Sequence, residues 1–444
     1  MRVKHHVHQL DKFPVYSAAW AADDVIALGG GGGANSRTGI KNKVRLVKVA
    51  EAGQKLDPID TFELPLSDDT PMSLALAPSS TESSREFVAG INSTSDPTDT
   101  TANQNCRRIV FSEKNAAQAT ATRNTIAAKD AYQSSKLRHW PPIPQRVVAF
   151  SPDGSFLATG STSNELAVLS YPSLQPVAPP ITIPEAEGEM FDVSINDTYI
   201  VAATTRFLII YSWMPQSSSP VAEDTGTKSK KSLKRKGSRA AAGLSSTTSQ
   251  QLDLKELQKI SVPSWAGLGA TFRAARFAIS YPKNIPINTL FAIVNAKVPS
   301  GRKFARKSFA LRYVLGDDSA QWGREAAKRA LGDNNISSFD VSTSGALLAY
   351  GRSDCAIGVL DATSLAPILE ILHAHDFPAT VVKFNPAANM LLSASADDTC
   401  RLVALPEGFA GQGSLSTIIL IIITILVVLV AIAGRLMFTP QLEG

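Results

Sequence analysis

Alternating apolar and polar positions, the pattern typical of β-strands, recur along most of this 444-residue chain. The clearest unit is a strand, a turn, a second strand ending in small residues, a polar turn and a third strand. It occupies residues 146–171, 338–361 and 380–403, and weaker copies begin near Tyr16, Met72, Met190 and Ala274. The copies recur irregularly, roughly every 40 to 65 residues, so the pattern predicts a repeat protein built from β-sheets.

The unit resembles the WD repeat, in which four strands form one blade of a propeller. The pair His375 and Asp376 before the last copy is similar to the Gly-His that usually opens such a repeat, although the chain contains no Trp-Asp dipeptide. Seven repeat starts therefore predict an all-β fold, a seven-bladed WD-repeat-like β-propeller over residues 1–405 with degenerate repeats. A closed ring leaves no sheet edge open, and we expect the strand-like residues 3–10 to complete the last blade.

Several segments interrupt or follow this pattern. Residues 115–137 and 216–249, rich in Ser, Thr, Ala and Lys, are predicted to be disordered insertions. Residues 321–331 are predicted to form a short helix, and residues 406–414 a tether. Residues 415–434 carry no charge, and a helix of about twenty apolar residues is long enough to cross a bilayer. Since a buried core helix is rarely apolar on all sides, we predict a single C-terminal transmembrane helix there, followed by a short tail at residues 435–444.

The orientation of that span follows from the rest of the chain. No hydrophobic export signal precedes residue 20. The cysteines, Cys106, Cys355 and Cys400, are too few and too far apart for a disulfide scaffold. We therefore expect the N-terminal body in the reducing cytosol and the tail on the luminal side. His5, His6 and His8 could bind a metal, but an edge strand or a solvated end is the commoner role for such a cluster.

The net charge of +5 is concentrated in one insert. Seven basic residues and no acidic ones lie in residues 228–239, so the rest of the chain is close to neutral. Such a run is compatible with a nuclear-import signal, a patch attracted to anionic lipid or a solvated loop. A near-neutral body argues against a nucleic-acid partner.

Motifs for covalent catalysis are absent from the sequence. It contains no Gly-x-Ser-x-Gly elbow, no His-Glu-x-x-His and no kinase motif set. The carboxylate pair Asp397 and Asp398 falls at a polar turn of the repeat, where acid–base catalysis is not expected.

Residues 29–42 contain five consecutive glycines directly after a strand-like run. Glycine costs more backbone entropy to order than other residues, and a hairpin could close with two residues. A phosphate-binding P-loop is disfavoured because Gly39 is followed by Ile40 instead of Lys and Ser or Thr. Two interpretations remain: a flexible hairpin tip, or a loop that a partner approaches closely or that holds an ion by its carbonyl oxygens.

Three features together are specific: this glycine-rich segment closing with Gly39, Ile40 and Asn42, the degenerate seven-bladed propeller, and one C-terminal span. In this combination the chain resembles the Sec-twelve family, which includes the animal prolactin-regulatory-element-binding protein. The resemblance implies a guanine-nucleotide exchange factor, without covalent chemistry, for the small GTPase that starts COPII coat assembly. It implies the endoplasmic-reticulum membrane as the location, with cycling to the Golgi membrane as an extension, and other COPII exit-site components as further partners.

The resemblance also implies a site. The exchange loop would consist of Gly30, Gly31, Gly32, Gly33, Asn35, Gly39, Ile40 and Asn42. A potassium ion would be held by Asn42 and by backbone carbonyls of residues 29–39, because hard cations take oxygen ligands and carbonyls can replace their water. Asn35, Ile40, Asn42 and Pro71 would contact the GTPase.

Two other functions stay open. The first is a membrane-tethered WD-repeat scaffold that assembles proteins without acting on nucleotide. The second is a nuclear DNA-binding regulator, which draws on the basic insert and on the name of the animal relative, and which a membrane span and a near-neutral body would contradict.

Overall fold

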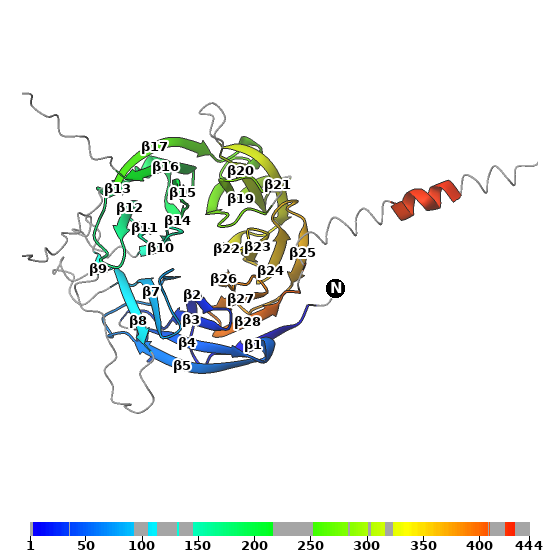
Figure 1. The fold of residues 1–444 in the computed structure, drawn as a ribbon. Helices are drawn as coiled ribbons and strands as arrows, with labels where there is room; N and C mark the ends of the chain where they lie inside the picture. The colour runs from blue at the N-terminus through cyan, green and yellow to red at the C-terminus, as the bar shows by residue number, and fades with distance from the viewer. Residues whose placement is uncertain are drawn as a thin grey trace, which may run out of the picture.

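The computed structural model describes residues 3–34, 36–92, 105–112, 131–132, 145–215, 252–282, 285–300, 303–315, 323–406, 408 and 422–430. In these residues the strands form seven four-stranded antiparallel sheets. Figure 1 shows the sheets arranged as blades around a common centre, with one strand of each blade nearest that centre. The predicted all-β, seven-bladed propeller is confirmed.

The blades follow one another along the chain, and each runs from an inner to an outer strand. Blade 1 comprises β2 (Val15–Ala22), β3 (Val25–Gly30), β4 (Lys43–Ala50) and β5 (Lys55–Glu63). Blade 2 comprises β6 (Ser73–Leu76), β7 (Ser84–Gly90), β8 (Cys106–Ser112) and β9 (Ala131–Tyr132). Blade 3 comprises β10 (Gln145–Phe150), β11 (Phe156–Ser161), β12 (Glu165–Ser170) and β13 (Ile181–Thr182). Blade 4 comprises β14 (Met190–Ile195), β15 (Tyr199–Thr204), β16 (Phe207–Pro215) and β17 (Leu252–Ser261).

The remaining blades have the same order, except that the last takes its outer strand from the N-terminus. Blade 5 comprises β18 (Thr271–Phe277), β19 (Thr289–Ser300), β20 (Lys303–Val314) and β21 (Arg324–Gly332). Blade 6 comprises β22 (Ile336–Val341), β23 (Leu347–Arg352), β24 (Ile357–Asp361) and β25 (Pro367–Ile371). Blade 7 comprises β26 (Ala379–Phe384), β27 (Met390–Ser395), β28 (Thr399–Ala404) and β1 (His5–Gln9). Short 3-10 helices lie at η1 (Glu51–Gly53), η3 (Glu185–Glu187) and η4 (Ser264–Ala266).

The ring is closed by the strand at the N-terminus, as the sequence predicted. β1 pairs antiparallel with β28, from His5 opposite Val403 to Gln9 opposite Thr399. This pairing joins the two ends of the propeller in one sheet and covers an edge of β28 that would otherwise be open.

The hydrophobic core is a ring of blade-to-blade interfaces. Seven clusters of buried side chains occur in the described residues, and each combines apolar side chains of two neighbouring blades. In blades 1, 3 and 4 the second strand is buried on both faces: β3, β11 and β15 are buried along their whole length apart from the first residue of β11. Burial on both faces explains why these strands lack polar alternation and end in small residues.

A polar network stabilises the turn of blade 7 from inside. Nδ1 of His375 lies 2.7 Å from Oγ1 of Thr399, and Nε2 lies 2.8 Å from Oγ of Ser393. Asp397 accepts hydrogen bonds from the backbone and the hydroxyl of Thr399, at 2.9 and 2.7 Å. Burial lowers the pKa of His375 to about 4, so the ring is neutral at physiological pH. The carboxylate pair at Asp397 and Asp398 thus belongs to a polar turn, as expected.

The predicted helix at residues 321–331 is wrong. Gln321 and Trp322 lie outside the described residues, and Arg324–Gly332 forms β21, the outer strand of blade 5. Its partner β20 is twelve residues long and offers a hydrogen-bonding edge from Ser308 to Val314. The helix propensity of Ala, Glu, Lys and Arg is at most tenths of a kcal/mol per residue, and tertiary pairing readily outweighs it.

The predicted disorder is wrong at one place. Ala131 and Tyr132, in the insertion assigned to residues 115–137, form β9 and pair with Arg107 and Cys106. Blade 2 takes its fourth strand from this insertion, which composition alone could not indicate. The rest of the insertion, and residues 216–249, lie outside the described residues.

Near the C-terminus the described helix covers residues 422–430 only. Within the residues that the structure describes, none of the helices has both the length and the apolar character needed to cross a bilayer. The flanks of the predicted span at residues 415–434, the tail at residues 435–444, and the tether at residues 406–414 apart from Pro406 and Gly408, lie outside the described residues.

Candidate functional site

The glycine loop, residues 31–42, connects the second and third strands of blade 1. Gly30 pairs with Lys43 across β3 and β4, so the chain leaves the sheet and returns to it at opposite positions. On its other side β3 pairs with β2, where Gly30 lies opposite Val15. The loop therefore projects from one end of a hairpin, β3 and β4, whose first strand is paired on both sides.

Close backbone packing requires glycine at the base of the loop. A Cβ at Gly30 would lie 2.0 Å from the carbonyl oxygen of Pro14, which also accepts a hydrogen bond from N–H of Gly31 at 3.0 Å. Gly31 has φ +144°, and a Cβ there would lie 2.3 Å from Oδ1 of Asn42. A side chain at Gly30 would displace the backbone at Pro14, just before β2, and one at Gly31 would displace Asn42.

Asn42 joins the two ends of the loop to the neighbouring blade. Its side chain is 5% exposed. Oδ1 accepts a hydrogen bond from N–H of Gly33 at 2.9 Å, and Nδ2 donates to the carbonyl of Asp68 at 2.8 Å. Because the oxygen faces a donor and the nitrogen an acceptor, the orientation of the amide is fixed by its partners. Asn42 thus holds the glycine loop against the segment that leads from blade 1 to blade 2.

That segment, residues 64–72, is called the connector below. Oδ1 of Asp69 accepts N–H of Ala34 at 3.2 Å and N–H of Thr70 at 2.8 Å. Asp68, 3% exposed, forms a two-pronged ion pair with Arg107 of β8 at 2.6 and 3.1 Å. A bidentate, largely buried pair of this kind fixes geometry as well as charge. The connector is therefore anchored in blade 2 and touches the loop at two points.

The tip of the loop is solvent-exposed. Arg37, Thr38 and Gly39 are exposed, and Ile40 is half-buried. Oγ of Ser36 lies 2.7 Å from Oγ1 of Thr38, which accepts N–H of Ile40 at 3.3 Å. The tip thus has its own short-range hydrogen bonds and presents Ile40 beside them. Asn35 lies outside the described residues.

Pro71 lies behind the base of the loop. It is buried, and its carbonyl accepts the hydroxyl of Ser17 at 2.6 Å. A Cβ at Gly29 would lie 2.9 Å from Cβ of Pro71. This position suits a residue that supports strand β3 rather than one that offers surface to a partner.

Several oxygen atoms gather against the glycine backbone. A Cβ on Gly31 would lie 2.9 Å from the carbonyl oxygen of Lys41, in addition to its contact with Oδ1 of Asn42, and one on Gly32 would lie 3.0 Å from the carbonyl oxygen of Ile40. Clusters of three or more His, Cys, Asp or Glu side chains suited to a metal do not occur in the described residues. The oxygen atoms at the loop are those of the Asn42 amide, of backbone carbonyls and of the Asp69 carboxylate, which are donors of the kind that hard cations take.

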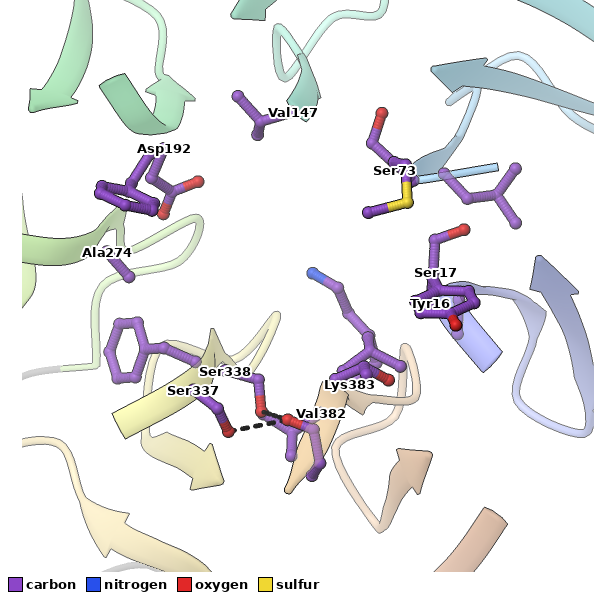
Figure 2. A pocket seen from close by; sticks show the side chains of 18 of the residues that line it. Tyr16, Ser17, Ser73, Val147, Asp192, Ala274, Ser337, Ser338, Val382 and Lys383 are labelled. Atoms are coloured by element: carbon purple, nitrogen blue, oxygen red, sulfur yellow. Dashed lines mark hydrogen bonds between the residues drawn. The ribbon is translucent and has the colours of Figure 1, made fainter. Parts of the chain in front are cut away.

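A cavity of about 660 Å³ occupies the centre of the ring and is lined mainly by the inner strands. Figure 2 shows Lys383 extending into it, with Ser337 and Ser338 on one wall and Ser17 on another. Nζ of Lys383 pairs with Asp340 at 2.7 Å, and Arg276 pairs with Asp192. These cations are already neutralised by carboxylates. Ser17 links the cavity to the connector, because its hydroxyl donates a hydrogen bond to the carbonyl of Pro71.

The structure brings together most of the residues predicted from sequence. Gly30 to Gly33 and Asn42 form the base of the loop, Gly39 and Ile40 its tip, and Pro71 its support. Sequence interpretation missed Asp68, Asp69 and Arg107. The polar run Ser67-Asp68-Asp69-Thr70 between two strands was the available signal, but only the following proline was noted.

Comparisons with known proteins agree with this class of fold. The WD domain, G-beta repeat, matches residues 143–168 and 367–403. The first match falls in blade 3, and the second runs from the outer strand of blade 6 through the first three strands of blade 7. Fold and match together define a seven-bladed WD-repeat propeller. SEC12-like protein 2 from Arabidopsis thaliana is 31% identical to this chain over 94 residues. That alignment covers 21% of this chain and 24% of the relative, so the chain matches about a quarter of that protein's length.

Proposed function

We propose that this protein is a guanine-nucleotide exchange factor for the small GTPase that initiates COPII vesicle budding at the endoplasmic reticulum. The observation that carries the proposal is a glycine loop held in one conformation at the rim of a propeller by a buried asparagine, Asn42. The similarity to SEC12-like protein 2 supports the same class of activity. Ordering so many glycines is costly, and a loop fixed in advance spares that entropy when a partner binds.

Exchange requires differential binding and no covalent step. A small GTPase with a picomolar dissociation constant holds its nucleotide by about 16 kcal/mol. A factor that binds the nucleotide-free GTPase more tightly than the loaded form lowers nucleotide affinity by the same ratio, because linkage is reciprocal. The exposed tip, including Ile40, would insert beside the nucleotide of the GTPase. Asn42 and the glycines at the base would hold the tip rigid.

A potassium ion fits the loop by donor chemistry. Oδ1 of Asn42 keeps one lone pair after accepting N–H of Gly33. The carbonyl oxygen of Lys41 lies beside Gly31 and that of Ile40 beside Gly32. When bound, the ion would neutralise the repulsion between these oxygens and so stiffen the loop. The side-chain hydrogen bonds of Asn42 with Gly33 and Asp68 hold the loop base independently of the ion.

A membrane location is part of the proposal. The uncharged residues 415–434 support an anchor in the endoplasmic-reticulum membrane, with the propeller on the cytosolic side and cycling to the Golgi membrane as an extension. The test is the distribution of a full-length fluorescent fusion compared with a version lacking residues 415–444. Loss of membrane association on deletion supports the anchor, and unchanged distribution contradicts it.

The exchange assay uses residues 1–406, a fragment that contains every strand of the closed ring. Release of a fluorescent GDP analogue from the purified COPII GTPase is measured with and without the fragment, in potassium and then in sodium. Acceleration in potassium that is lost in sodium supports both exchange and the ion. Equal acceleration in the two salts supports exchange and contradicts the ion.

A WD-repeat scaffold without exchange activity is the second candidate. The match to WD repeats favours it, since propeller rims commonly bind proteins. Binding of the GTPase without acceleration of nucleotide release would support the scaffold over the exchange factor. If the GTPase does not bind and nucleotide release is not accelerated, both candidate functions are contradicted.

A further inference from the structure

Asn42 has a counterpart in blade 3. Asn164 likewise lies just before the third strand of its blade, and its carbonyl accepts N–H of Ile183 at 2.8 Å. The carbonyl of Asn42 accepts N–H of Leu64 at 2.9 Å, at the corresponding place in blade 1. Both residues therefore have the same backbone role, which is to hold the start of the segment leading to the next blade.

The side-chain nitrogens of the two asparagines also correspond. Nδ2 of Asn164 donates to the carbonyl of Gly188 at 2.8 Å, in the segment between blades 3 and 4. Nδ2 of Asn42 donates to the carbonyl of Asp68, in the connector, at 2.8 Å. In both blades the amide thus links a hairpin to the segment that enters the next blade.

The side-chain oxygens differ. Oδ1 of Asn164 accepts N–H of Met190, two residues after Gly188, at 2.9 Å. At the same sequence offset in blade 1, two residues after Asp68, lies the amide of Thr70, three residues before β6. Oδ1 of Asn42 does not accept it, because Oδ1 of Asp69 lies 2.8 Å from this N–H. The oxygen of Asn42 is instead 2.9 Å from N–H of Gly33, within the glycine loop.

A third asparagine, in the second strand of blade 5, also binds the next blade through both ends of its amide. Asn295 of β19 accepts N–H of Ile336 at 2.8 Å and donates to the carbonyl of Ile336 at 3.1 Å. In blades 3 and 5, therefore, both ends of the asparagine amide bind the segment that enters the next blade. Only in blade 1, among these three, does the oxygen turn to its own hairpin loop.

We propose that Asp69 is the positioning residue of the glycine loop. Its carboxylate accepts the hydrogen bond of the Thr70 N–H, which leaves the oxygen of Asn42 available for the N–H of Gly33. The same carboxylate binds the loop directly by accepting the N–H of Ala34. The ion pair of Asp68 with Arg107 keeps the connector in place for both contacts. The consequence for nucleotide exchange rests on the proposed function; the consequence for loop order does not.

The contacts predict what removal of the carboxylate does. In Asp69→Ala, the Thr70 amide loses its partner, and the oxygen of Asn42 can take it, as Asn164 takes Met190. The glycine loop then loses its bonds at Gly33 and Ala34 together. Asp69→Asn keeps an oxygen for the Thr70 amide, so it should retain most of the wild-type loop order.

Hydrogen exchange of the loop, measured by mass spectrometry on the full chain, tests this directly. In Asp69→Ala the amides of residues 31–42 should exchange about five- to thirtyfold faster, the effect of losing one or two hydrogen bonds of about 1 kcal/mol each. Asp153→Ala is the matched control, since Asp153 accepts the N–H of Ser155 at 3.1 Å in a turn of blade 3. Unchanged loop exchange in Asp69→Ala, or equal acceleration in the control, would overturn the inference.

Kinetics separate positioning from general destabilisation. If the ordered loop is populated about tenfold less, the apparent affinity for the GTPase falls by the same factor. KM should then rise about tenfold in Asp69→Ala with kcat little changed, and Asp69→Asn should restore it. A lower kcat at constant KM would mean a smaller folded fraction and would contradict positioning. Should the wild type not accelerate nucleotide release, the proposed function fails, while the hydrogen-exchange result still decides the role of Asp69.

Discussion

Blades 1 and 7 are neighbours in the ring, yet they use the connection between their second and third strands in opposite ways. In blade 7 this connection is residues 396–398, a tight turn whose Asp397 is bonded to Thr399 and lies 3.7 Å from His375. In blade 1 it is residues 31–42, and the polar groups of Asn42 and Asp69 point into the loop. The connection between the second and third strands is thus a tight turn in blade 7 and a long, partly exposed loop in blade 1. The two connections differ in their polar side chains, whereas the second and third strands on either side of each connection are alike.

The largest expected effect concerns blade 7 and pH. Folded His375 takes up a proton only near pH 4, whereas in the unfolded chain it titrates near 6.5. The unfolded state therefore binds more protons between these values. Neutral His375 therefore contributes fully to the free energy of unfolding above about pH 6.5. This contribution, about 3 kcal/mol in all, is lost as the pH falls toward 4. Urea unfolding of residues 1–406 at several pH values measures it.

His375→Asn separates this residue from other titrating groups, because the variant cannot take up the proton. Its unfolding free energy should be lower at pH 7 and should depend less on pH than that of the wild type. If the two pH profiles are parallel, the turn of blade 7 does not depend on a neutral His375. Folded wild type and folded His375→Asn should accelerate nucleotide exchange equally, because the glycine loop lies in blade 1.

The second effect concerns Asn42. Asn42→Ala removes two hydrogen bonds worth about 1 kcal/mol each, so kcat/KM for nucleotide exchange should fall about 30-fold. Asn164→Ala removes two equivalent bonds in blade 3 and is the control. We expect it to lower the melting temperature similarly while leaving kcat/KM of the folded protein unchanged. Equal loss of exchange in both variants would mean that the loop has no special role.

The smallest effect is expected at the tip. Ile40 is half-buried in the free protein, and its remaining apolar surface would be buried against the GTPase. Ile40→Ala should weaken GTPase binding by about 1 kcal/mol, or roughly fivefold, without changing thermal stability. Titration calorimetry with the nucleotide-free GTPase measures the change. An unchanged dissociation constant would remove Ile40 from the interface and restrict the loop's role to its base.

Much of the fold could be predicted from local pattern. All seven inner strands begin within a few residues of the predicted starts, and the N-terminal strand closes the ring. The predictions failed at β9 and β21, two outer strands. Outer strands have one exposed edge and little burial, so neither apolar periodicity nor composition marks them. Their existence depends on the edge that the preceding strand offers.

In the candidate site, too, local features could be predicted from the sequence and long-range contacts could not. The glycine loop with Asn42 was visible in the sequence, because consecutive glycines and a strand on each side are local features. Asp69 and Arg107 were not, since their roles depend on contacts across 35 and 39 residues of chain. Nothing in the order of residues says that Asp69 takes the amide that an asparagine takes in blade 3.

The sequence by itself therefore determined the number of blades, the closure of the ring and the place of the glycine loop. These depend on the two-residue period of strands and on turn residues, which act over a few positions. Only the tertiary structure decided which polar atoms hold the loop, because each oxygen of Asn42 and Asp69 has a choice of N–H partners. That choice is settled when neighbouring blades pack and bring distant backbone amides within hydrogen-bonding distance.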